Sequence, residues 1–138
     1  MAKVYNIFIS HSWTYSDTYD RLVNLLNARG YFSFNNYSVS KDDPIHHAPN
    51  VDALYQAIYQ HMGPCHIVLI MAGVYATYSK WISREIRIAK REFLSPKPIL
   101  GIKPWGNVNV STIVERNADA IVSWNTESVV SAIRRLAL

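Results

Sequence analysis

Cysteine is nearly absent from this chain of 138 residues, which has Cys65 alone. A single thiol cannot form an internal disulfide, and it is typical of proteins that work in a reducing compartment. Long hydrophobic runs are also missing, because no apolar run approaches the ~20 residues that span a bilayer. No signal peptide precedes the first apolar run, so we expect a cytoplasmic protein without a membrane partner.

Glycine is scarce as well, with five residues in the whole chain. Neither G-x-x-x-x-G-K-[ST] nor G-x-G-x-x-G follows the first apolar run, which excludes the usual phosphate-binding loops. The five histidines do not have the spacing of a zinc site, and the adjacent His46 and His47 lie in a polar stretch where such residues are usually solvated. We therefore expect neither a bound metal nor a resident cofactor.

Charge is limited too, at 17% of residues, whereas apolar residues make up 49%. This balance is typical of a folded globular chain, and the length suits one domain covering residues 1–138. The net charge of +4 is spread over several predicted helices, without a long basic tract or interleaved aromatic residues. Nucleic acid is therefore not an expected partner.

Short apolar runs alternate with amphipathic segments along the whole chain. The runs that predict strands cover residues 4–9, 31–34, 65–71, 99–102 and 120–122. The segments that predict helices follow them: one from Ser16 to Gly30, then 51–62, 78–93, 111–117, and a last one from Asn125 or Thr126. We expect Gly30 to end the first helix in the left-handed C′ position.

Strands that alternate with helices predict a parallel sheet covered on both faces. At this length we expect a flavodoxin-like α/β sandwich, with five parallel strands in the order 2-1-3-4-5. Ligands bind such sheets beyond the carboxyl ends of the strands, where the strand order reverses. Here that point lies between the first and third strands, next to residues 10–13 and 72–78, with residues 35–50 nearby.

The segment 78–93 places a carboxylate beside this point. Glu85 lies on the flank of a predicted apolar stripe, away from the basic residues of the helix, and Glu92 shares that flank. The two glutamates differ in their distance from this point, because Glu92 lies about 10 Å farther along the helix axis. The stripe itself consists of Ile82, Ile86, Ala89 and Phe93.

Two stretches carry a family resemblance. "NIFISHSW" resembles the first box of TIR domains, the Toll/interleukin-1 receptor fold, and "YATYSKWISRE" resembles the TIR segment that opens the third helix. The resemblance is sharper to bacterial TIR-like proteins such as the Thoeris antiphage sensor than to animal receptor domains. The chain departs from the animal pattern at residues 42–50, "DDPIHHAPN", and near its C-terminus, where the Phe-Trp box is not evident.

The resemblance implies an enzyme that cleaves NAD⁺, as a substrate, between nicotinamide and ribose, with Glu85 as the catalytic carboxylate. Nicotinamide leaves NAD⁺ as a neutral molecule, so a second carboxyl group is not required to protonate it. The remaining expected site residues are the aromatic Phe8, Tyr75 and Trp81 around the rings, and the polar Ser10, His11 and Asn36 near ribose or phosphate. Trp81 is equally a candidate for simple packing, and Ser10 for capping a turn.

The resemblance also implies partners. The expected product is an ADP-ribose-type signal, such as cyclic ADP-ribose, that reaches a separate effector protein. Self-assembly and a phage-derived trigger are expected to control activity. Two alternatives stay open: a non-enzymatic TIR-like interaction module, and a nucleoside or nucleotide ribosyltransferase of similar architecture.

Overall fold

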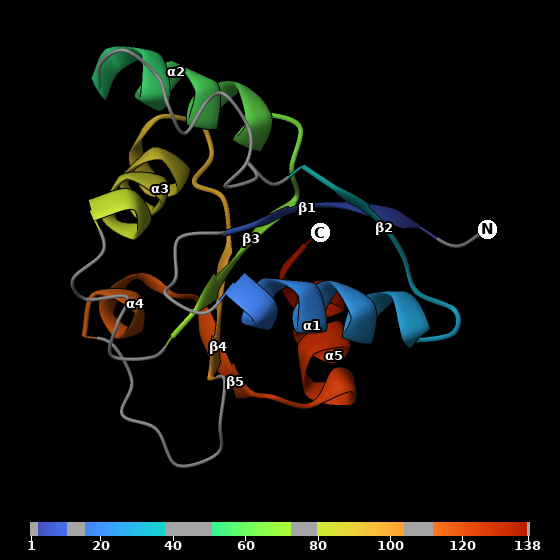
Figure 1. Ribbon diagram of the computed structural model, residues 1–138. Helices are drawn as coiled ribbons and strands as arrows, with labels where there is room; N and C mark the ends of the chain where they lie inside the picture. The colour runs from blue at the N-terminus through green and yellow to red at the C-terminus, as the bar shows by residue number, and fades with distance from the viewer. Residues whose placement is uncertain (1–2, 11–15, 38–50, 73–79, 104–111, 138) are drawn as a thin grey trace.

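The computed structural model describes residues 3–10, 16–37, 51–72, 80–103 and 112–137 (Figure 1). Its strands form one five-stranded sheet in the order β2-β1-β3-β4-β5, and all four neighbouring pairs are parallel. The predicted sheet and strand order are therefore confirmed. The strands are β1 Val4–Ile9, β2 Ser33–Asn36, β3 Ile67–Met71, β4 Ile99–Lys103 and β5 Ala120–Ser123.

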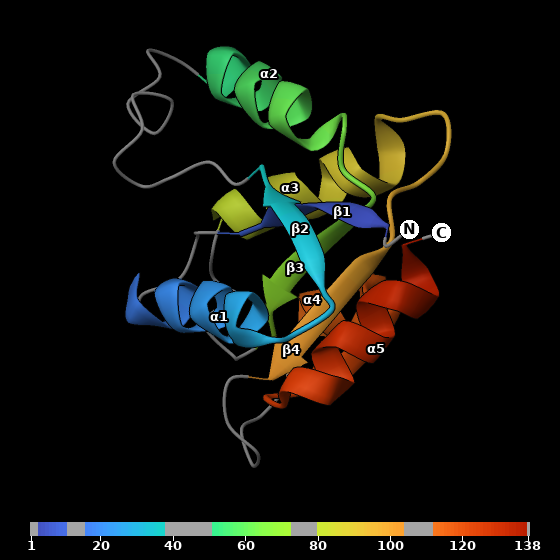
Figure 2. The same ribbon diagram turned by 90° about the vertical axis from the view of Figure 1, so that its right-hand side faces the viewer.

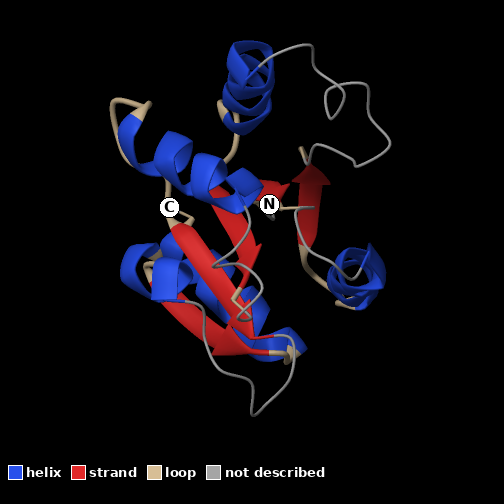
Figure 3. Cartoon of the chain, turned by 60° about the vertical axis from the view of Figure 1, so that its left-hand side comes forward, coloured by secondary structure: helices blue, strands red, loops and turns tan. Residues whose placement is uncertain are grey.

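Helices cover both faces of this sheet (Figures 2 and 3). On one face lie α1 Ser16–Ala28 and α5 Thr126–Leu136, and on the other lie α2 Val51–Met62, α3 Lys80–Arg91 and α4 Thr112–Asn117. In the described part of the chain, no helix has the length and hydrophobicity needed to cross a membrane.

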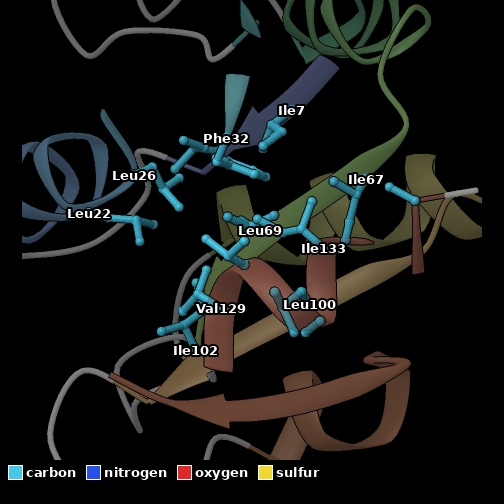
Figure 4. Close-up of a cluster of buried hydrophobic side chains, with 14 of the residues drawn as sticks. Ile7, Leu22, Leu26, Phe32, Ile67, Leu69, Leu100, Ile102, Val129 and Ile133 are labelled. Carbon is cyan, nitrogen blue, oxygen red and sulfur yellow. The ribbon is translucent and has the colours of Figure 1, made fainter. Parts of the chain in front are cut away.

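Two hydrophobic clusters hold these layers together, one on each face of the sheet. The central strand β3 is buried at every position, and its side chains alternate between the clusters. Each fully buried aliphatic side chain contributes about 1.5–3 kcal/mol relative to an exposed one. Figure 4 shows the cluster against α1 and α5, which includes Ile7, Leu69, Leu22, Leu26, Val129 and Ile133.

The second strand begins later than the sequence pattern predicts. Ladder pairing starts at Val4 with Ser33, so residues 31 and 32 precede the strand and pairing continues to Asn36. Phe32 accounts for the apolar signal, because its side chain is buried in the core before the ladder begins. The predicted range 31–34 was therefore shifted by two residues, since apolar character reports burial and not strand pairing.

The turn after α1 also differs from the prediction. Gly30 does not adopt a positive φ; the left-handed residue is Tyr31, with φ of 60°. The Arg134 guanidinium donates a hydrogen bond of 2.7 Å to the Tyr31 carbonyl oxygen. A contact from α5 therefore accompanies a conformation that glycine would adopt more easily, and the prediction that Gly30 is the left-handed residue was wrong.

The amino end of the sheet contains a neutral histidine. Two hydrogen bonds join Asn6 and His66. The Asn6 backbone N–H donates to the ring Nδ1 of His66 at 2.9 Å, and the His66 backbone N–H donates to the Asn6 carbonyl oxygen at 2.7 Å. An accepting Nδ1 must be unprotonated. Burial lowers the pKa of His66, and the positive charges of Lys3 and Lys97 lower it further.

This geometry predicts a loss of stability in acid. The unfolded chain, in which His66 has a higher pKa, takes up a proton before the folded chain does, so stability falls as pH drops below about 6.5. His66→Asn keeps an acceptor oxygen near the position of Nδ1 and does not titrate. The free energy of unfolding, measured in urea at pH 7 and pH 5, should therefore fall less for His66→Asn than for the wild type. Equal losses would contradict this account.

The same end of the sheet encloses the Cys65 thiol. Its Sγ donates a weak hydrogen bond of 3.5 Å to the His61 carbonyl oxygen, and the side chain is 3% exposed. Burial raises the pKa of Cys65 to about 12, although the nearby Lys97 opposes this shift. The thiol is therefore protonated at neutral pH and serves as a small core residue.

A protonated, enclosed thiol should resist alkylation. At pH 8 we expect iodoacetamide to modify the native protein at least about a hundredfold more slowly than the urea-unfolded protein, whose thiol has an ordinary pKa. Mass spectrometry follows the reaction directly, because Cys65 is the single cysteine in the chain. Similar rates in the two states would show that the thiol is accessible and ionised.

Candidate functional site

The carboxyl ends of β1 and β3 meet where the strand order reverses. The chain leaves β1 toward α1 on one face of the sheet and leaves β3 toward α3 on the other. Ser10 directly follows β1, and its N–H donates to the Leu69 carbonyl oxygen of β3 at 3.0 Å. Open parallel sheets bind ligands at such a point.

Helix α3 brings a carboxyl group to this point. The predicted apolar stripe packs on the sheet: Ile82, Ile86 and Ala89 are buried, together with Ile88. Glu85 lies in the second turn of the helix, between Ile82 and Ile86 in sequence, and its side chain is also fully buried. The isoleucines that anchor the helix therefore hold Glu85 against the interior.

Ser10 and Glu85 contact each other although they are 75 residues apart in sequence. The Ser10 hydroxyl donates a hydrogen bond of 2.7 Å to Glu85 Oε1, and both side chains are 0% exposed. Ser10 reaches α3 because side chains alternate along a strand: Phe8, two residues earlier, packs into the cluster that contains α3. Burying a carboxyl group is costly without such a partner.

Glu92 has a different environment, although it shares a flank with Glu85 in the sequence pattern. It is exposed and lies just beyond the last residue of α3. The pKa of Tyr55 is raised by burial and by a side-chain hydrogen bond with Glu92. Glu92 therefore belongs to the surface between α2 and α3. The two glutamates differ in burial, because Glu85 is buried and Glu92 is exposed.

Asn36 does not come close to Ser10. It pairs in register with Ile7, three residues before Ser10, which corresponds to about 10 Å along the strand. Alternation also places Asn36 on the same sheet face as Phe34, which packs with the α1 and α5 cluster. The structure therefore places Asn36 and Ser10 on opposite faces.

The other expected site residues fall into two groups. Phe8 is fully buried beneath the switch point, packed in the cluster that contains Ile82 and Ile86. Trp81 belongs to the first turn of α3, but its side chain lies outside the described part of the structure, as do His11 and Tyr75. Their expected contacts with a substrate stay predictions.

The described residues contain no group of three or more histidine, cysteine, aspartate or glutamate side chains arranged to hold a metal ion. What the site offers is a carboxyl group with a fixed orientation.

Sequence reasoning named both Ser10 and Glu85 but did not pair them. The available signal was the spacing from Phe8 to Ser10, which puts a polar side chain on the same face as a core residue.

Comparison with known families identifies the family of the chain. A family model described as "Thoeris protein ThsB, TIR-like domain" matches residues 8–109, which is well over half of the chain and includes Ser10 and Glu85. No curated protein matches the chain. The extent of the family match, together with the flavodoxin-like sheet, shows that the chain belongs to the TIR-like domain family of the Thoeris protein ThsB.

Proposed function

We propose that this protein cleaves the bond between nicotinamide and ribose in NAD⁺, with Glu85 as the catalytic carboxylate, as part of antiphage defence. The observation that carries the proposal is the position of Glu85, fully buried at the switch point between β1 and β3. Membership of the Thoeris TIR-like family supports the antiphage role.

The chemistry of NAD⁺ suits a single carboxylate. Nicotinamide departs as a neutral ring from a positively charged pyridinium, so no group has to protonate it. Positive charge develops on the ribose carbon as the bond breaks, and an ionised Glu85 beside that carbon stabilises it. A carboxylate already fixed by its surroundings does this without reorganisation during the reaction.

The burial of Glu85 prevents a substrate from reaching its carboxyl group in this conformation. A side chain that is 0% exposed can meet a ribose only after neighbouring groups move. We therefore expect the substrate-bound state to differ from this one at the carboxyl end of the sheet. This requirement agrees with an enzyme that becomes active on assembly, in response to a phage-derived trigger.

The group that attacks the ribosyl centre determines the product. Water gives ADP-ribose, whereas an adenine nitrogen or a ribose hydroxyl of the same molecule gives a cyclic ADP-ribose. A cyclic product that diffuses to a separate effector protein suits a signalling role. Both products require the same first step, so Glu85 is needed for either.

Glu85→Gln tests the proposal, because the amide keeps the shape and a hydrogen-bond acceptor but loses the negative charge. We expect nicotinamide release from NAD⁺ to fall at least ~100-fold, since stabilisation of the developing cation is lost. Mass spectrometry of the nucleotides would measure release, with and without infected-cell lysate and with enforced oligomerisation. Glu92→Gln is the matched control and should stay within about twofold of the wild type, because Glu92 is exposed.

Other outcomes would point to other functions. If the wild type releases no nicotinamide under any of these conditions, a non-enzymatic interaction module is the better account. In that case Glu85→Gln should leave partner binding unchanged. Cleavage of nucleosides or nucleotides without cleavage of NAD⁺ would instead indicate a ribosyltransferase of related chemistry.

A further inference from the structure

The Ser10 hydroxyl donates a hydrogen bond to the Glu85 carboxyl group. We infer that Ser10 is a positioning residue, which orients the Glu85 carboxylate for the reaction and does not donate a hydrogen bond to the ribose of the substrate. This inference rests on the proposed function and assigns Ser10 a role distinct from the ribose contact expected from the sequence.

The Ser10 hydroxyl can donate one hydrogen bond at a time. A serine hydroxyl has one proton to donate, and here it is directed to Glu85 Oε1 at 2.7 Å. This distance falls in the range of hydrogen bonds from a hydroxyl to an oxygen acceptor, near the short values found for charged acceptors. While that bond persists, Ser10 cannot also donate to a ribose oxygen.

The backbone of Ser10 is bonded to the central strand β3. Its N–H donates to the Leu69 carbonyl oxygen at 3.0 Å, which completes the β1–β3 ladder at the Ile9–Leu69 pair. The side chain is 0% exposed. The hydroxyl is therefore fixed to the central strands of the sheet and not to a surface loop.

The Glu85 side chain has more torsional freedom than helix packing removes. Glu85 has three side-chain torsions, and packing of Ile82 and Ile86 fixes the helix but not each of those torsions. A hydrogen bond from the sheet to Oε1 fixes the far end of the side chain. Catalytic groups lose rate steeply when displaced by about 1 Å, so this bond should affect the chemical step more than binding.

Steady-state kinetics of Ser10→Ala test the inference under the conditions in which the wild type releases nicotinamide. We expect kcat for NAD⁺ to fall about 10- to 100-fold, with KM within about twofold of the wild type. Ser10→Cys has a similar size and a weaker donor, so its kcat should lie between those of the alanine variant and the wild type. If the alanine variant does not fold, as judged by circular dichroism and thermal unfolding, the cysteine variant provides the test.

A double variant separates positioning from an independent contact with the substrate. Added to Glu85→Gln, Ser10→Ala should cause no further loss of kcat, because Ser10 acts through the Glu85 carboxylate. The inference is overturned if KM rises while kcat is kept, or if the two losses multiply in the double variant. A wild type that never releases nicotinamide would overturn the proposed function itself, and this inference with it.

Discussion

The hydrogen bond between Ser10 and Glu85 is the contact on which the switch point depends. Among the described residues, these are the two polar side chains that are buried. A buried carboxyl group without a donor would cost several kcal/mol, and a buried hydroxyl without an acceptor would cost somewhat less. Each side chain therefore makes the burial of the other tolerable, and together they join α3 to the end of β1.

Helix α3 carries its packing residues and the proposed catalytic carboxylate on one surface. Its buried isoleucines attach it to the sheet, and Glu85 lies among them, while Arg87 and Arg91 face solvent. A carboxylate on the exposed face would be surrounded by water and by positive charges, both of which would weaken its effect on the cation that develops in the proposed reaction. Glu85 lies instead on the packed face, where the proposed reaction requires neighbouring groups to move before a substrate reaches it.

The two ends of the parallel sheet differ in the chemistry of their side chains. At the amino end, the lowered pKa of His66 and the raised pKa of Cys65 both favour the neutral forms of these side chains. Both side chains also form hydrogen bonds with the backbone. At the carboxyl end, Ser10 and Glu85 form a polar pair. This division follows from the parallel arrangement, because every strand delivers its next loop to the same edge, where ligands bind.

The sequence by itself determined the order of elements, because a short apolar run marks or adjoins each strand and the longer helices α1, α2, α3 and α5 show a repeat of about 3.6 residues. The bounds of α2, Val51–Met62, agree with its periodicity, and Asn125, one of the two expected caps, accepts the Ser128 N–H at 3.0 Å. These features depend on neighbours a few residues away.

Only the tertiary structure decided the features that depend on distant residues. Pairing with β1 set the start of β2 at Ser33, and a contact from α5 accompanies the left-handed Tyr31. Register and alternation placed Asn36 away from Ser10, and helix packing brought Glu85 to it across 75 residues. Periodicity reports which face of an element is buried, whereas the distance between two such faces is set by how the layers pack.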